Sequence, residues 1–537
     1  MGETNKNNKF DVFGVMVDVS RNAVLKVETL KKLIDYLSKM GYNAIELYAE
    51  DTYKIDGEEM LGYMRGGYTK EDIKEIDAYA KEKGMELIPC IQTLAHYTSP
   101  CRLLKYKPII DINDILLCGD EKTYEFIENI FKTVKECFTS RKINIGMDEA
   151  HMVGLGKYLV KNGYQDRFEI LCKHVKRVSE ICEKYGFTPH MWSDMFFRLA
   201  MGGEYLATEK FDKKILDSIP NNMELTYWDY YTDNVEQYDK MINAHKKFEK
   251  NLWFAGGCWS WQGVVPENWF SLKTMLPAMQ SVSKNGIKNV LITLWGDNGG
   301  ECSFFSLLPS LYAVKRYADG EYDRATIAKE FNELFGLNFE DFMLLDSPNF
   351  TKRYYEEGER ENTSKIMLYT DCFMGIFDDH AEACGQIDYA GFAEKLTKAK
   401  KNAKDLAYVF DPVIDICKVL DIKFLIGVRT RKAYKANDRK ALKGLVKEYK
   451  ELAKRVEAFY QSFRTAWFIE KRGFGFEIQD ARLGGLIMRA NSCAKRLEDY
   501  LSGKIDFIEE LDQEILSLGE PSMASYGYSD CVSLSNI

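Results

Sequence analysis

Two adjacent acidic residues, Asp148 and Glu149, occur in the segment NIGMDEA at residues 144–150. Cleavage of a glycosidic bond needs a proton donor for the leaving oxygen and anionic or nucleophilic help at the anomeric carbon. Neighbouring residues of a strand point to opposite faces, so consecutive acids cannot face each other across one bond. At the end of a strand the chain turns, and both acids can then reach a pocket from one side. The pair therefore favours a reaction in which the nucleophile belongs to the substrate.

Most of the tryptophans also lie at the ends of predicted strands. Five of the eight in the chain do so: Trp192, Trp228, Trp259, Trp261 and Trp295. An indole ring can stack on the apolar face of a sugar, while a fixed carboxylate accepts hydrogen bonds from sugar hydroxyls. The alternative is that these rings fill the upper layer of a barrel interior. Tryptophans beside acids at one rim favour a carbohydrate site.

The elements that would position these residues begin at residue 13, where short β-rich runs alternate with longer amphipathic segments. This alternation predicts parallel strands joined by right-handed crossovers. Eight such units over about 320 residues favour a closed (β/α)₈ barrel. An open doubly wound sheet is the alternative, but the glycine-rich phosphate loop expected after its first strand is missing. The predicted strands are 13–20, 43–50, 86–92, 143–149, 188–194, 224–230, 252–261 and 289–296.

The active pocket of such a barrel lies at the carboxyl ends of its strands, because the loops that follow them build it. Several predicted helices run directly into a glycine (Gly41, Gly84 and Gly186), the left-handed stop expected before the next strand. The polar and aromatic residues at the predicted strand ends are Asp18, Ser20, Arg21, Glu50, Asp51, His96, Asp148, Glu149, His151, Trp192, Asp194, Tyr227, Trp228, Asp229, Trp259, Trp261, Trp295 and Asp297.

The strand pattern stops after about residue 335. Apolar residues at three- and four-residue spacing in 386–410, 412–435, 437–467 and 480–517 predict packed helices. The predicted organisation is an N-terminal tail (1–12), a catalytic barrel (13–335) and an α-helical domain (336–537). The segment 467–477 is rich in aromatic residues and glycine. It is either a turn between helices or a loop lining the leaving-group side of the pocket, its own or a dimer partner's, so a homodimer is left open.

Composition excludes several classes of protein. A net charge of −9 and a pI near 5.5 argue against a nucleic-acid partner. The thirteen cysteines lack the spacing of a zinc site or a disulfide framework, and free thiols in this number suit a reducing compartment. The N-terminus has no signal-peptide core, and no stretch reaches the length of a membrane-spanning helix. We expect a cytoplasmic protein with a glycan substrate and with no metal, cofactor or membrane span.

The segment NIGMDEA resembles the Gly-x-Asp-Glu motif of glycoside hydrolase family 20, the β-N-acetylhexosaminidases. Four further segments are similar to motifs of that family and follow in the same order. They are DVSRN (18–22), LIPCIQTLAH (87–96), TYWD (226–229) and LWGD (294–297). The resemblance covers about residues 13–320 and implies a (β/α)₈ barrel enzyme that releases terminal β-linked N-acetylhexosamine.

The resemblance also implies substrate-assisted, retaining hydrolysis. The 2-acetamido oxygen of the substrate attacks the anomeric carbon and gives an oxazolinium intermediate. Asp148 is expected to hold the acetamido N–H, and Tyr227 to orient the acetamido oxygen. Glu149 is expected to protonate the leaving oxygen and then to deprotonate the incoming water.

The remaining roles implied by the resemblance concern substrate binding. Arg21 is expected to bind two ring hydroxyls, and Asp297, with Asp229, to bind others. His96 resembles the histidine that tunes the acid, with Glu50 or Asp51 behind it. The walls of the acetamido pocket are expected to be Trp192, Trp259 and Trp295.

Two departures from the family pattern affect specificity. The barrel begins almost at the first residue, without the small α/β domain that often precedes it. Asp297 stands where glutamate is common, which shortens its reach and leaves the choice between gluco and galacto sugars open. The alternative functions are a two-carboxylate retaining glycosidase acting on a sugar without an acetamido group, and a catalytically inactive glycan-binding barrel.

Overall fold

The computed structural model describes residues 9–200, 202–207, 211, 213–353, 358, 360–517, 519 and 527–533, so residues 1–8 of the predicted tail lie outside the described residues. By packing, the chain forms two compact units. The first is Met1–Cys258, Ser271–Trp295 and Ser310–Asp323, and the second is Trp259–Phe270, Gly296–Pro309 and Arg324–Ile537. The predicted domain limits of 335 and 336 stay a prediction.

Eight parallel strands close into a barrel in the order β1-β10-β9-β8-β7-β6-β3-β2, which confirms the predicted (β/α)₈ fold. The bounds are β1 Val12–Asp18, β2 Ala44–Ala49, β3 Glu86–Ile91, β6 Lys142–Asn144, β7 Thr188–Trp192, β8 Glu224–Trp228, β9 Leu252–Gly257 and β10 Asn289–Leu294. A separate antiparallel pair, β4 (Ile110–Ile112) and β5 (Ile115–Leu116), was not predicted. Its strands are too short for a periodic pattern to be visible.

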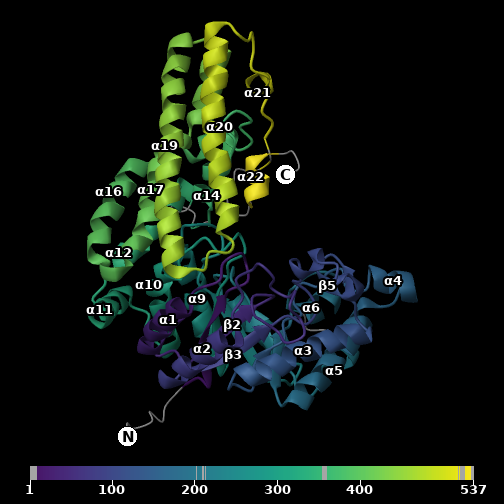
Figure 1. The fold of residues 1–537 in the computed structure, drawn as a ribbon. Coiled ribbons are helices and arrows are strands. Elements are labelled where there is room, and N and C mark those ends of the chain that lie inside the picture. The colour runs from purple at the N-terminus through teal and green to yellow at the C-terminus, as the bar shows by residue number, and fades with distance from the viewer. Residues whose placement is uncertain are drawn as a thin grey trace. The chain divides into compact units, whose positions relative to one another are not determined.

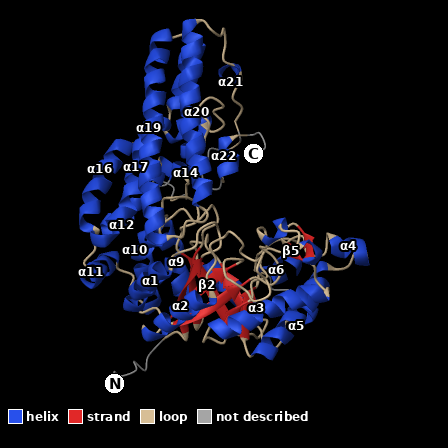
Figure 2. Ribbon diagram, viewed as in Figure 1, coloured by secondary structure: helices blue, strands red, loops and turns tan. Residues whose placement is uncertain are grey.

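Helices fill the connections between the strands and surround them, as the red strands and blue helices of Figure 2 show. The α-helices of the first 323 residues are α1 Val27–Met40, α2 Lys70–Glu82, α3 Glu121–Cys137, α4 Lys157–Asn162, α5 Arg167–Tyr185, α6 Asp194–Ala200, α7 Lys213–Leu216, α8 Val235–Lys246, α9 Asn268–Lys284 and α10 Leu308–Asp319. Helices α1 and α5 end at Gly41 and Gly186, both in the left-handed conformation, as predicted.

Alternation along the strands fixes which side chains enter the barrel. Residues paired between neighbouring parallel strands point the same way, and a polar layer shows which way is inward. Asn144 donates to Glu46 over 3.0 Å, and His190 lies 3.2 Å from Glu46 and stacks on Trp253 at a ring distance of 4.1 Å. Thr226 contacts His190 over 3.0 Å. On β8, therefore, Thr226 and Trp228 face the interior, and the residue between them faces the helices.

The second unit is helical, which confirms the predicted all-α region. Its helices are α11 Arg324–Phe335, α12 Phe339–Met343, α14 Thr363–Tyr369, α15 Asp378–Cys384, α16 Tyr389–Ala399, α17 Phe410–Lys423, α18 Ile426–Lys435, α19 Arg439–Glu470, α20 Phe476–Ser502, α21 Glu509–Asp512 and α22 Tyr528–Val532. The two longest, α19 and α20, lie side by side (Figure 1). Among the described residues, no helix combines the length and apolar character that a membrane crossing requires.

The segment 467–477 is mostly helical. Helix α19 extends to Glu470, α20 begins at Phe476, and Gly475 between them has a φ of 90°. Trp467 is buried, and its indole N–H donates to the carbonyl of Arg472 over 2.9 Å. The short connection is thus a packed turn between two helices.

Candidate active site

The carboxyl ends of the barrel strands bring a group of polar and aromatic side chains together. Those that belong to the first compact unit are Asp18, Arg21, Glu50, Gln92, His96, Asp148, Glu149, Trp192, Asp194, Tyr230 and Trp295. All of them lie at or beyond the last residue of a strand, where the loops begin. This is the end at which barrel enzymes place their catalytic groups.

A left-handed turn after β6 determines how the two adjacent acids point. The strand ends at Asn144, five residues earlier than predicted, because Gly146, Met147 and Glu149 all have positive φ angles of 71°, 72° and 52°. Such angles cost about 1–3 kcal/mol for a residue with a side chain and persist only when neighbours hold them. Here Gly146 donates its N–H to Asn144 Oδ1 over 3.0 Å, and Met147 donates its N–H to Gln92 Oε1 over 3.3 Å.

The turn gives the two carboxylates different environments. The side chain of Asp148 is 11% exposed, whereas that of Glu149 is 47% exposed. Asp148 accepts a hydrogen bond from Gln92 Nε2 over 3.1 Å and lies 3.1 Å from His96 Nε2. Burial raises the pKa of Asp148, but His96 and Gln92 outweigh it and hold the pKa below its usual value. Asp148 is therefore an anchored carboxylate, and Glu149 is accessible from outside.

Asp194, at the end of β7, holds the backbone of Glu149. Its Oδ2 accepts the Glu149 N–H over 3.2 Å and lies 3.3 Å from Arg198 Nε. Asp194 is fully buried, and burial, with the nearby Asp148 carboxylate, raises its pKa to about 7. Asp194 was named among the polar residues at the predicted strand ends but was given no role, and Gln92 was not singled out. Both lie within predicted strand ends, but only their spatial contacts single them out.

Arg21 lies at the same rim, against two aromatic rings. Its Nε donates to Glu50 Oε1 over 2.9 Å, and its guanidinium lies 5.4 Å from the ring centres of both Tyr48 and Trp295. His96 Nδ1 lies 4.0 Å from the same Glu50 oxygen. Glu50 rather than Asp51 is therefore the acid behind His96. Asp51 pairs with Arg65 instead, at 3.3 Å.

In the described part of the chain, Tyr227 makes no hydrogen bond to either of the adjacent acids, Asp148 and Glu149. It lies between the two inward positions of β8, so its ring points toward the helices and meets Phe254 and, at 5.0 Å, His245 of α8. Its hydroxyl donates to Asp229 Oδ2 over 3.0 Å. Asp229 in turn accepts the N–H groups of Tyr231 and Thr232, so it shapes the loop after β8. This placement differs from the one expected for both residues, because a strand ending at Trp228 turns Tyr227 outward.

Tyr230 occupies the inner position instead. It is 6% exposed, stacks on Trp228 at a ring distance of 5.3 Å, and its hydroxyl hydrogen-bonds with the Trp295 side chain. Burial raises the pKa of Tyr230 well above its usual value and outweighs the hydrogen bonds with Trp295 and Thr293, which lower it; Asp148 adds to the rise. Sequence reasoning missed Tyr230 because the Tyr-x-Asp match selected Tyr227, although the run WDYY contains further tyrosines.

The other predicted tryptophans and acids divide between the compact units. Trp192 lies in the first unit with Trp295, and the two rings are 6.0 Å apart. Trp259 and Asp297 belong to the second unit. Trp259 is buried and stacks on Trp261 at a ring distance of 4.0 Å, and Asp297 is exposed. Among the described residues, no group of three or more His, Cys, Asp or Glu side chains is arranged to hold a metal ion.

Comparison with known proteins gives matches in both parts of the chain. Residues 10–247 match the model described as "Glycosyl hydrolase family 20, catalytic domain", and residues 340–528 match "Glycoside Hydrolase 20C C-terminal domain". Together the two models cover well over half of the chain. The chain is 23% identical over 298 residues to hexosaminidase D of Bos taurus, which covers 51% of this chain and 82% of that protein.

Other relatives are matched over smaller shares of their length. The β-hexosaminidase of Porphyromonas gingivalis is 24% identical over 219 residues, which is 35% of this chain and 28% of that protein. Among solved structures, the chitobiase of Flavobacterium johnsoniae gives a TM-score of 0.49 at 14% identity, covering 94% of this chain and 74% of that chain. The β-N-acetylhexosaminidase of Streptomyces coelicolor gives a TM-score of 0.45 at 18% identity, covering 61% of this chain and 70% of that chain.

We expect the stabilisation from the His96–Asp148 pair to depend on pH. Burial lowers the pKa of His96, but the Asp148 carboxylate outweighs it and raises the pKa to about 9. Because this lies above the usual histidine value of 6.5, the stabilisation is complete below pH 6.5 and is lost as the pH rises toward 9. The difference in Tm between wild type and His96→Gln should therefore shrink across this window.

His174→Gln is the matched control. Burial lowers the pKa of His174 to about 4, so this histidine is neutral in the folded chain across the window, and from about pH 7.5 upward it is largely neutral in the unfolded chain as well. The Tm difference between wild type and the control should stay constant from about pH 7.5 to 9, where the His96→Gln difference still shrinks. A constant difference for both variants would show that His96 is uncharged beside Asp148.

Proposed function

The chain belongs to glycoside hydrolase family 20, and we propose that it is an exo-acting β-N-acetylhexosaminidase that releases terminal β-linked GlcNAc or GalNAc. The observation that carries this proposal is the unequal pair of adjacent acids, one buried and charge-paired, the other accessible. A conventional retaining glycosidase needs two carboxylates on opposite sides of one bond, about 5–5.5 Å apart. Adjacent acids on one turn suit a nucleophile supplied by the substrate.

The proposed reaction is substrate-assisted and retains the anomeric configuration. The acetamido oxygen of the substrate forms a bond to the anomeric carbon as the bond to the leaving oxygen breaks, and Glu149 gives its proton to that oxygen. Asp148 accepts the acetamido N–H and stabilises the positive charge that develops on the oxazolinium ion. In the second half, Glu149 removes a proton from water, which attacks the anomeric carbon and reopens the ring.

The environment of each acid supports these roles. Asp148 has a lowered pKa and is held by Gln92 and His96, so it is ionised and cannot rotate freely. A charge fixed in advance stabilises a developing positive charge without reorganisation. Glu149 must exchange its proton with water during each cycle, and its side chain is about half exposed.

We propose Tyr230, in place of Tyr227, as the tyrosine that donates to the acetamido oxygen. Its hydroxyl lies at the inner face of the site beside Trp295 and within the field of Asp148. Arg21 is proposed to bind ring hydroxyls. Trp192 and Trp295 are proposed to line the sugar site. Trp259 and Asp297 are each proposed to be substrate-binding residues.

We expect Tyr230→Phe to lower kcat on β-GlcNAc substrates by roughly 10²–10³-fold, as loss of one charge-stabilising donor does in other enzymes. Tyr227→Phe is the matched control. It removes the same hydroxyl from a tyrosine three residues earlier, in β8, whose ring faces α8. It should change kcat by less than about twofold and lower Tm slightly through the lost bond to Asp229. The reverse pattern would return the role to Tyr227.

We expect Glu149→Gln to lose most activity on substrates with poor leaving groups and much less on activated aryl glycosides, which need little protonation. The amide keeps the size of the side chain but cannot donate a proton to the leaving oxygen. Steady-state kinetics on a series of leaving groups with graded pKa would measure the difference. Equal losses across the series would remove Glu149 from the acid role.

The proposed activity is tested by hydrolysis of chromogenic β-GlcNAc, β-GalNAc and β-glucose substrates side by side. The first two should be cleaved, and β-glucose should not, because it lacks the acetamido nucleophile. A thiazoline analogue of the oxazolinium intermediate should inhibit more strongly than the product. Efficient cleavage of β-glucose, or a covalent glycosyl adduct on Asp148, would favour a two-carboxylate glycosidase. No cleavage of any of the three would favour an inactive glycan-binding barrel.

A further inference from the structure

Asp297 is carried by a tight turn that includes three glycines. The carbonyl of Gly296 accepts the N–H groups of Gly299 over 2.9 Å and Gly300 over 2.8 Å. Gly299 and Gly300 have φ angles of 114° and 60°, which residues with side chains rarely adopt.

Charged groups of the helical segments hold this turn at its far end. Glu301 is buried, and its carboxylate accepts from Lys365 of α14 over 3.0 Å and from Gln479 and Arg482 of α20, each over 3.1 Å. Lys365 also donates to the carbonyl of Asn298 over 3.0 Å. Burial raises the pKa of Glu301, but Lys365 and Arg482 outweigh it and hold the pKa below its usual value. A buried carboxylate with three donors is a rigid attachment point.

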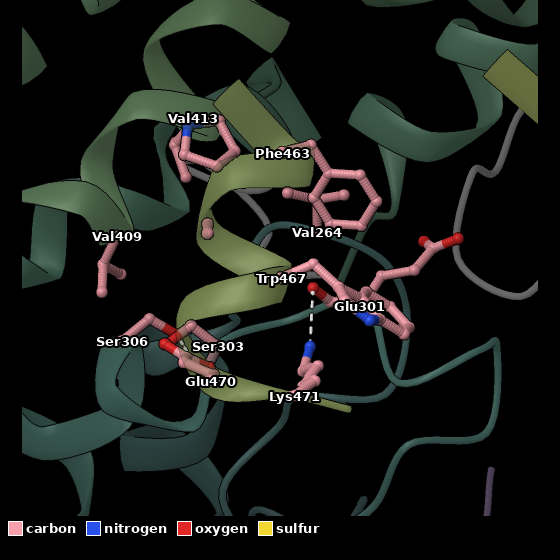
Figure 3. A pocket seen from close by; sticks show the side chains of 12 residues that line it. Val264, Glu301, Ser303, Ser306, Val409, Val413, Phe463, Trp467, Glu470 and Lys471 are labelled. Atoms are coloured by element: carbon pink, nitrogen blue, oxygen red, sulfur yellow. Dashed lines mark hydrogen bonds between the residues drawn. The ribbon is translucent and has the colours of Figure 1, made fainter. Parts of the chain in front are cut away.

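Lys471, in the connection after α19, binds the backbone of the same turn (Figure 3). Its buried ammonium donates to the carbonyls of Gly300 over 2.5 Å, Cys302 over 3.2 Å and Glu301 over 3.4 Å. It also lies 4.7 Å from the centre of the Trp467 ring. All three donor positions of the ammonium group can thus be used. Next to it, the Ser303 hydroxyl donates to Glu470.

The space beside this contact is too small for a ligand. The cavity lined by Phe463, Trp467, Glu470, Lys471 and Glu301 has a volume of about 20 Å³, and Figure 3 draws the side chains that line it. That volume is enough for one water molecule. The charged groups at the end of α19 therefore serve the turn and not a subsite of their own.

The loop that carries Trp259 is held by the helical segments in the same way. The Arg360 guanidinium lies 4.5 Å from the Trp259 ring centre, and Asn362 donates to the carbonyl of Gln262 over 3.2 Å. The N–H of Asn298 donates to the carbonyl of Trp261 over 3.3 Å, so the two loops are tied to each other. Both loops follow barrel strands in sequence, yet they pack with the helical unit.

We propose that Lys471 and Glu301 are positioning residues that fix the turn 296–302, so that Asp297 meets the sugar hydroxyls in one conformation. The helical segments are then part of the specificity apparatus, and their role is to preset two loops. This inference rests on the proposed function, since it assumes that Asp297 binds the sugar. The residues involved contact the turn and not the reacting atoms.

The test is a double-mutant cycle between Lys471→Met and Asp297→Asn, read as kcat/KM on chromogenic β-GlcNAc and β-GalNAc. Lys471→Met should lower kcat/KM on β-GlcNAc by roughly tenfold or more, because small misplacements of a binding group have large kinetic effects. It should shift the ratio of the two substrates in the same direction as Asp297→Asn. The kcat/KM of the double variant should be about equal to that of the Asp297→Asn single variant.

Arg489→Met is the matched control. Arg489 lies on α20 and forms a two-pronged ion pair with Asp371, at 2.6 and 3.0 Å, without contacting the turn. It should lower Tm and leave the ratio of the two substrates unchanged. If Lys471→Met does not fold, Glu301→Gln, which keeps the volume but replaces one acceptor oxygen with an NH₂ group, should shift the ratio in the same direction.

The outcomes separate this inference from the proposed function. A wild-type protein that cleaves neither acetamido substrate would overturn the proposed function. A wild-type protein that cleaves them, with a ratio unmoved by Lys471→Met and Glu301→Gln, would overturn only the positioning role. Additive losses in the double variant would also overturn it, because Lys471 would then act independently of Asp297.

Discussion

The left-handed turn at Gly146–Glu149 is the constraint on which the rest of the first unit's site depends. It ends β6 early and turns two consecutive acids away from the alternation of a strand. The turn is costly, and its neighbours hold it through Asn144, Gln92 and Asp194. Each of these three polar side chains comes from the end of a different strand. The closed barrel is what brings those ends within hydrogen-bonding distance.

Burial then separates the two acids chemically. Asp148 lies under the rim, where a partly buried histidine and a buried amide compensate for its lost hydration. Glu149 remains at the surface of the turn, while a second buried acid, Asp194, restrains its backbone. The same four-residue turn thus supplies one carboxylate with a fixed charge and one that can exchange protons with solvent. Neither property belongs to the residue types themselves.

The sequence was sufficient for the barrel and for the gathering of acids at its rim, and the physical reason is periodicity. The hydrophobic periodicity of the strands and helices is clear in each of the eight units. The carboxyl ends of parallel strands in a closed barrel must also meet at one rim. The pair β4–β5 was missed because its strands span three and two residues. The helical region was also predictable, since α16 to α20 carry clear apolar spacing.

Which tyrosine faces the barrel interior could not be predicted in the same way. Tyr227 and Tyr230 lie in one run of aromatic residues, and choosing between them requires knowing which strand positions face inward. That is set by the Thr226–His190 contact and by the residue at which β8 ends, and neither is visible in a motif. Gln92 and Asp194 were missed for a related reason. Their importance lies in partners more than forty residues away in sequence.

The order of synthesis gives the interleaved loops a further consequence. A nascent chain that has passed residue 309 already contains every strand of the barrel and both loops, 259–270 and 296–309. The groups that hold those loops, Lys365, Lys471 and Arg482, all lie further along the chain. The strands can pair while the ribosome is still translating, but the two loops have to wait for the last helices. Premature termination within the helices would therefore leave a barrel with all its strands and two unanchored loops.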